Sequence, residues 1–102
     1  MKLLTKELIE KIPPLYNQDG KGVNAIAYIK LFTPDSNFTW YITEFDPETK
    51  NCFGLVDGFE KELGYFSLTE IEEIKGPLGL EVERDVSFHQ TKLKNLGFNY
   101  GD

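Results

Sequence analysis

The chain has 102 residues and a formal net charge of −6, with 40% hydrophobic and 14% aromatic residues. This length suits one domain over residues 1–102, and the aromatic content favours a folded chain over a disordered one. The negative charge argues against direct binding to a nucleic-acid backbone, which requires basic residues.

The lone cysteine, Cys52, excludes an internal disulfide and fits a reducing compartment. No apolar run approaches the roughly 20 residues of a membrane span, and no signal-peptide region follows Met1. We therefore expect a cytoplasmic protein that does not bind membranes.

The first half of the chain predicts one helix and two strands. Thr5 is a suitable N-cap for a helix over residues 6–12, which Pro13 ends. An apolar run over 25–32 predicts a strand, and a second strand over 39–46 is rich in aromatic and β-branched residues. Strict alternation along this second strand gives one face four residues: Trp40, Ile42, Glu44 and Asp46.

Residues 53–74 organise the second half as strand, acidic loop, strand and helix. Asp57 and Gly58 are the favoured pair of a two-residue hairpin turn. That turn would place Leu55 opposite Glu60 and mix apolar with charged residues on one face. We therefore expect a six-residue loop over 57–62 between two short strands.

A capping box marks the start of the next helix. In it, the Ser67 side chain accepts a hydrogen bond from the amide of Glu70, and the Glu70 carboxylate accepts one from the amide of Ser67. Its apolar stripe consists of Leu68, Ile71 and Ile74. We predict an α+β fold: an antiparallel meander of four to five strands, with the N-terminal helix and a second helix over about 68–75 packed on one face.

Signals weaken towards the C-terminus. Residues 80–83 alternate like an edge strand, and 91–96 predict one or two helical turns with Gly97 as cap. We expect residues 86–102 to be loosely ordered.

All of the negative excess lies in residues 44–73, which hold nine acidic residues and two lysines. Carboxylates that gather in space steer and orient a basic protein partner, while an exposed apolar residue supplies affinity. We therefore expect a non-enzymatic acidic interaction protein with a basic protein partner. Its candidate binding residues are Glu44, Asp46, Asp57, Phe59, Glu60 and Glu62.

A competing hypothesis is a divalent-metal-dependent hydrolase or nuclease that uses Glu44, Asp46 and Asp57. Carboxylate oxygens bind Mg²⁺ or Ca²⁺ and act as acid and base, provided that three converge on one ion. The chain contains no EF-hand, HExxH or CxxC pattern, and we expect no cofactor. A nucleophilic pair of Cys52 and His89 is less expected than a small buried thiol and a histidine at the surface or at the edge of the core.

A third possibility is an accessory subunit that completes a larger assembly through an exposed strand edge. The sequence leaves the identity of the partner and the oligomeric state open.

Three stretches carry a resemblance: LLTKELIEKIPPLY (3–16), KLFTPDSNFTWYITEFD (30–46) and LVDGFEKELGYFSLTEIEEIKGPLGLEVERD (55–85). Over nearly the whole chain they resemble a family of small bacterial, plasmid and phage proteins that is catalogued as a domain of unknown function. The most specific stretch is GFE-x-ELGYFSL. The resemblance implies a single-domain protein often carried by mobile elements, and it supplies no catalytic residues. The chain departs little from the family pattern, except in the tail after Asp85.

Overall fold

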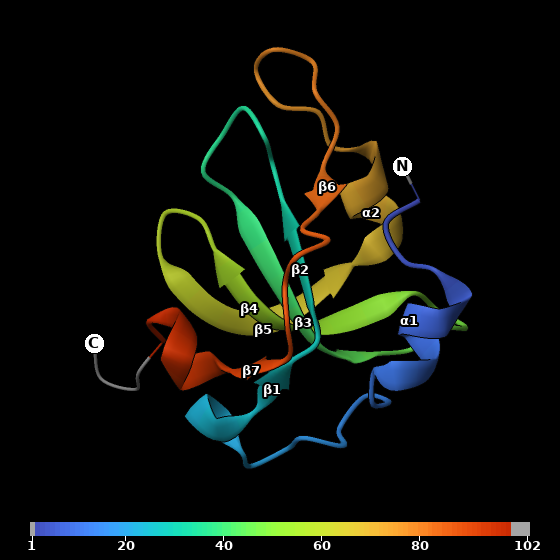
Figure 1. Ribbon diagram of the computed structural model, residues 1–102, viewed down its shortest axis with the longest axis vertical. Coiled ribbons are helices and arrows are strands. Elements are labelled where there is room, and N and C mark those ends of the chain that lie inside the picture. Colours follow the sequence, from blue (N-terminus) through green and yellow to red (C-terminus); the bar gives the residue numbers. More distant parts are fainter. Residues whose placement is uncertain (1, 99–102) are drawn as a thin grey trace.

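The computed structural model describes residues 2–98 and centres on a five-stranded antiparallel sheet (Figure 1). The strands follow the order β5-β4-β3-β2-β6. Their bounds are β2 (Ile29–Phe32), β3 (Thr39–Phe45), β4 (Asn51–Asp57), β5 (Lys61–Ser67) and β6 (Glu83–Arg84). A two-stranded sheet pairs β1 (Ile26–Ala27) with β7 (Thr91–Lys92). Strands β2 to β5 form the predicted meander, and the α+β class is confirmed.

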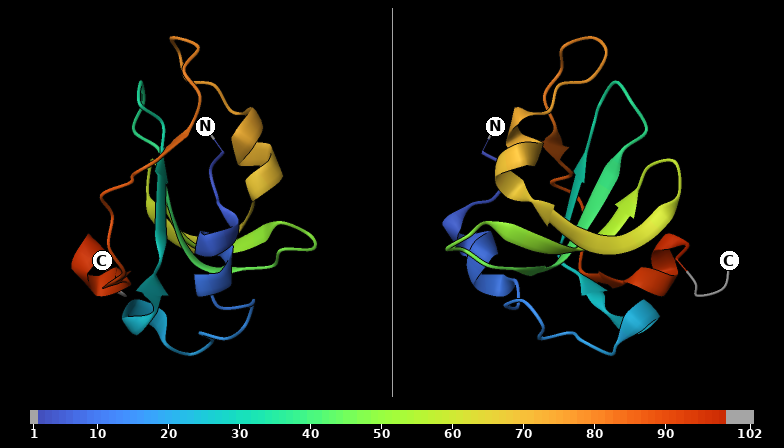
Figure 2. Two further views of the ribbon diagram at one scale, coloured as in Figure 1. Left: turned by 45° about the vertical axis from the view of Figure 1, so that its right-hand side comes forward. Right: turned by 180° about the vertical axis from the view of Figure 1, so that it is seen from behind.

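Two short helices, α1 (Lys6–Lys11) and α2 (Leu68–Glu73), lie on the same side of the sheet (Figure 2). Their apolar side chains join those of the sheet in one cluster. Its buried members are Leu3, Leu4, Ile12, Ile29, Leu31, Trp40, Ile42, Phe45, Cys52, Leu68, Ile71 and Val82. No helix within residues 2–98 is long and apolar enough to cross a membrane.

Both helices begin at a hydroxyl cap. The side-chain oxygen of Thr5 accepts from the Leu8 amide, and that of Ser67 accepts from the Glu70 amide, each at 3.3 Å. The capping signals therefore predicted both starts. The second helix ends at Glu73, two residues earlier than expected.

Residues 22–27 and 91–98 cover the opposite side of the sheet (Figure 2). The 3₁₀ turns η1 (Gly22–Asn24) and η2 (Leu93–Leu96) lie there (Figure 2), and Gly97 ends η2 in the predicted left-handed conformation, with φ 81°. The buried members of this second cluster are Ala25, Ala27, Tyr41, Leu55, Leu93 and Phe98. Residues 91–98 thus pack against the sheet, although we expected 86–102 to be loosely ordered; residues 99–102 lie outside the described part.

A β-bulge in β3 changes which side chains share a face. Ile42 lies opposite Gly54 whereas Glu44 lies opposite Phe53, so Thr43 is an extra residue between two ladder positions. Strict alternation would keep Glu44 on the face of Ile42. The bulge moves it to the opposite face, which corrects the expected alternation.

The β4–β5 hairpin turns through three residues, 58–60. Leu55 lies opposite Leu63, and Asp57 lies opposite Lys61. The expected six-residue loop was wrong. The three-residue turn also sets Leu55 opposite an apolar residue, although Val56 then lies opposite Glu62.

Candidate functional site

The β4–β5 hairpin ends in an exposed aromatic side chain. Its turn closes with a 3.1 Å hydrogen bond from the Gly58 amide to the Glu60 carbonyl, which leaves Phe59 at the tip. Phe59 is 99% exposed. An edge-to-face contact with Phe38, with ring centroids 5.8 Å apart, orients the Phe59 ring.

A surface hollow of about 320 Å³ lies beside this turn. It is lined by Phe38, Val56, Gly58, Phe59, Glu60 and Glu62. Phe38 and Val56 are half-buried, whereas Glu60 and Glu62 are exposed. A Cβ at position 58 would lie 2.4 Å from a ring carbon of Phe38, so glycine permits this approach. The hollow offers apolar surface beside two negative charges.

Asp57 belongs to the same hairpin but faces the other side of the sheet. Strand alternation places it with Leu55, on the side of Tyr41. Burial raises the pKa of the Tyr41 phenol, and the charges of Asp57 and Asp85 raise it further. Of the predicted site residues, the structure therefore brings together three at the tip: Phe59, Glu60 and Glu62.

Glu44 does not reach the surface. It is 2% exposed, and its carboxylate accepts hydrogen bonds from the Tyr16 amide at 2.9 Å and the Gln18 amide at 2.6 Å. The bulge at Thr43 turns it under the loop that carries these amides. Glu44 is thus a structural residue, which corrects its assignment to the binding surface.

Asp46 closes the turn that follows β3. Its carboxylate accepts from the Glu48 amide at 3.0 Å and from the Thr49 hydroxyl at 2.9 Å. These hydrogen bonds lower the pKa of the Asp46 carboxyl below its usual value. Its oxygens are engaged within the turn, away from the hairpin tip.

The three carboxylates of the metal hypothesis do not converge. Glu44 lies opposite Phe53 and Asp57 opposite Thr39, at separate positions along β4, while Asp46 binds its own turn. Within residues 2–98, no three His, Cys, Asp or Glu side chains are grouped so that they could hold a metal ion.

Cys52 and His89 do not form a nucleophilic pair. Cys52 is fully buried beneath the helices, and desolvation raises its pKa to about 12. His89 is exposed between β6 and β7. The buried thiol and the surface histidine agree with the simpler interpretation.

A second exposed aromatic pair was missed by sequence reasoning. Tyr16 is 62% and Tyr65 58% exposed, beside a hollow of about 400 Å³. Partial desolvation raises the pKa of the Tyr65 phenol, and so do the Tyr16 phenol and the charges of Asp19 and Glu44. Tyr16 adopts a φ of 73°, which no sequence pattern here predicts.

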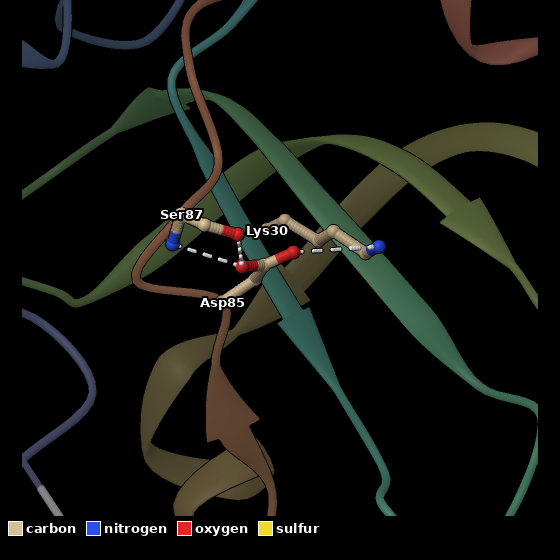
Figure 3. A network of polar contacts seen from close by, with 3 residues as sticks. All are labelled: Lys30, Asp85 and Ser87. Carbon is tan, nitrogen blue, oxygen red and sulfur yellow. Dashed lines mark hydrogen bonds and ion pairs between the residues drawn. The ribbon is translucent and has the colours of Figure 1, made fainter.

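A polar network fixes the segment after β6 (Figure 3). Asp85 accepts from the hydroxyl and the amide of Ser87 at 2.7 and 2.9 Å, and lies 3.6 Å from Lys30 Nζ. The Ser87 hydroxyl, with these other contacts, lowers the pKa of Asp85. Because both carboxylate oxygens are engaged, we assign Asp85 a structural role.

The fold and the hairpin tip define an acidic α+β protein with an exposed aromatic turn. The chain belongs to the family described as "Protein of unknown function (DUF2958)", whose family model matches residues 3–96. This confirms the resemblance to an uncharacterised domain family. Neither the curated proteins nor the solved structures gave a match.

Proposed function

We propose that this protein is a non-enzymatic interaction protein whose hairpin tip binds a basic protein partner. The observation that carries the proposal is the exposure of Phe59 beside Glu60 and Glu62. Burying a phenylalanine against a partner stabilises a complex by about 2 kcal/mol or more, so a water-exposed ring at a turn is suited to anchor one.

The acidic residues have a separate part in this proposal. Exposed carboxylates contribute little affinity each, but together they accelerate encounter with a positively charged surface and orient it. The hollow beside Phe59 has apolar surface from Phe38 and Val56. A long basic side chain fits both features, since its methylene stem is apolar and its end group is charged.

The setting that we propose is the cytoplasm of a bacterial host that carries a mobile element. It rests on the lone buried cysteine and on the family resemblance. A host defence or DNA-handling protein with an exposed basic surface suits this setting.

Affinity capture with quantitative mass spectrometry tests the proposal. The wild-type protein, Phe59→Ala and the double variant Glu60→Gln/Glu62→Gln are each used as bait in a bacterial host lysate. We expect proteins with basic surfaces to be recovered by the wild type at about 50 mM salt and lost at about 300 mM. Both variants should recover at least about tenfold less of the same proteins.

Matched controls locate the effect at the tip. Glu7→Gln/Glu10→Gln makes the same charge change on α1, where both residues are exposed, and Leu78→Ala removes an apolar residue that is 80% exposed elsewhere. Both controls should recover partners as the wild type does. Equal losses in the tip variants and in the controls would contradict the proposal.

A further inference from the structure

β5 has one unpaired edge. It pairs with β4 alone among the strands of residues 2–98, and it stands at the end of the strand order. The pairing is regular over all seven residues, without a bulge. None of the seven is buried. A long, regular and uncovered edge of this kind is a template for another strand.

The hydrogen bonds that flank the hairpin ladder show which backbone groups are free. The Leu68 amide donates to the Lys50 carbonyl, and the Gly58 amide to the Glu60 carbonyl. In an antiparallel ladder such bonded pairs occur at every second residue, so the even-numbered residues of β5 bond β4. The backbone groups that point outward from β5 belong to Lys61, Leu63, Tyr65 and Ser67.

Side chains along this edge differ between the two faces. Leu63 and Tyr65 give apolar surface on the face of Leu55, and Tyr16 lies beside Tyr65. The other face carries Phe66, which packs against the cluster beneath the helices, and Glu62, next to the hollow at the tip. Near the tip, an added strand therefore meets apolar groups on one face and negative charge on the other.

We propose that β5 receives an extended segment of the basic partner as a sixth strand, in which basic and apolar residues alternate. The basic residues lie on the face of Glu62, and the apolar residues lie over Leu63 and Tyr65. This inference rests on the proposed function and specifies the form of its partner.

Charge favours such a segment over a second copy of this chain. Each copy carries a net charge of −6, and its own β4–β5 hairpin would bring another Glu60 and Glu62 to the contact. Lys61 is the one basic residue of β5, and its Nζ is directed towards Gly97.

The test uses a synthetic eight-residue peptide, alternating lysine and valine, with blocked termini. Fluorescence anisotropy measures its binding to the full-length protein at low salt. We expect the alternating peptide to bind at least about tenfold more tightly than a peptide with four lysines followed by four valines. In antiparallel addition, opposed residues share a face, so the valine amides face β5. N-methylation of the valines should then abolish binding, and N-methylation of the lysines should not.

Two protein variants test the same bonds from the other side. Tyr65→Pro removes an outward amide that β4 does not use, and a proline is tolerated at such an edge position. Tyr65→Val removes the phenol and keeps the amide. Peptide binding should be lost in the first variant and retained in the second.

The outcomes separate this inference from the proposed function. If both peptides bind equally, and both N-methylated series bind equally, the added strand is overturned while a charge-based contact at Glu60 and Glu62 stands. If neither peptide binds at low salt, both proposals fail. A defined dimer of the protein alone in analytical ultracentrifugation, lost in Tyr65→Pro, would assign the edge to a second copy and overturn the inference.

Discussion

The carboxylate of Glu44 accepts a 2.6 Å hydrogen bond from the backbone amide of Gln18, in the interior of the protein. Gln18 is itself buried, and its side-chain amide bonds both backbone groups of Ile26 and the carbonyl of Thr43. These hydrogen bonds connect the loop after α1 to the bulge of β3. Glu44, a residue type that suggests a surface site, therefore stabilises the interior of the fold.

Glu44→Gln should destabilise the protein by about 2 kcal/mol. The glutamine oxygen replaces one acceptor, but its NH₂ group faces a backbone donor that then stays unpaired. Urea unfolding followed by circular dichroism measures the difference. The control Glu48→Gln, at an exposed position, should change the free energy of unfolding by less than about 0.5 kcal/mol. Equal effects in the two variants would contradict a structural role for Glu44.

The sequence predicted the elements of the fold well, because caps, apolar runs and turn residues act locally. Both helix starts and the meander followed from such signals. The bulge at Thr43 did not, since it depends on how β3 pairs with β4 and on a buried partner far along the chain. Because strict alternation ignores this one extra residue, the sequence prediction placed Glu44 on the wrong face of β3.

Gly54→Ala should be strongly destabilising, by at least about 3 kcal/mol. A Cβ at Gly54 would lie 1.8 Å from the Tyr41 carbonyl oxygen, so β3 and β4 must separate locally. Its cross-strand neighbour Gly64 is the matched control, because a Cβ there meets nothing within 4 Å. Gly64→Ala should be neutral or stabilise by up to about 1 kcal/mol. Thermal unfolding measures both variants, and equal shifts of their melting temperatures would contradict this account.

The turn after β3 should make stability depend on acid pH. Because the pKa of Asp46 is lowered in the folded state, its contribution is fully present above the unfolded pKa of about 3.9 and is lost as pH falls through the folded pKa. The free energy of unfolding of the wild type and of Asp46→Asn should therefore differ at pH 6, and this difference should shrink progressively as the pH falls below about 3.9. A difference that persists at low pH would contradict this assignment.

The thiol of Cys52 should be inert in the folded protein. Its pKa of about 12 and its full burial leave almost no accessible thiolate at pH 8. Reaction with a disulfide reagent should be at least about 100-fold slower than in urea-unfolded protein. Rapid labelling of the native protein would show that the cluster around Cys52 opens or that the thiol is exposed.

The candidate site was predicted in part. An aromatic residue in an acidic loop indicated Phe59, and it stands at the tip with Glu60 and Glu62. Strand alternation places Asp57 on the opposite side of the sheet from them. This alternation includes Asp57 because the turn holds three residues and not the expected six. The β5 edge could not be found from its own sequence, since whether a strand is an edge depends on the whole strand order.

Photo-crosslinking at position 59 tests the central claim most directly. Phe59 is replaced by p-benzoylphenylalanine, and a control protein carries the same group at Leu78, which is also exposed. The account predicts covalent capture of proteins with basic surfaces from position 59 at low salt, suppressed by Glu60→Gln/Glu62→Gln and absent from position 78. Capture of the same proteins with equal yield from both positions, or from position 59 without dependence on those two glutamates, would contradict it.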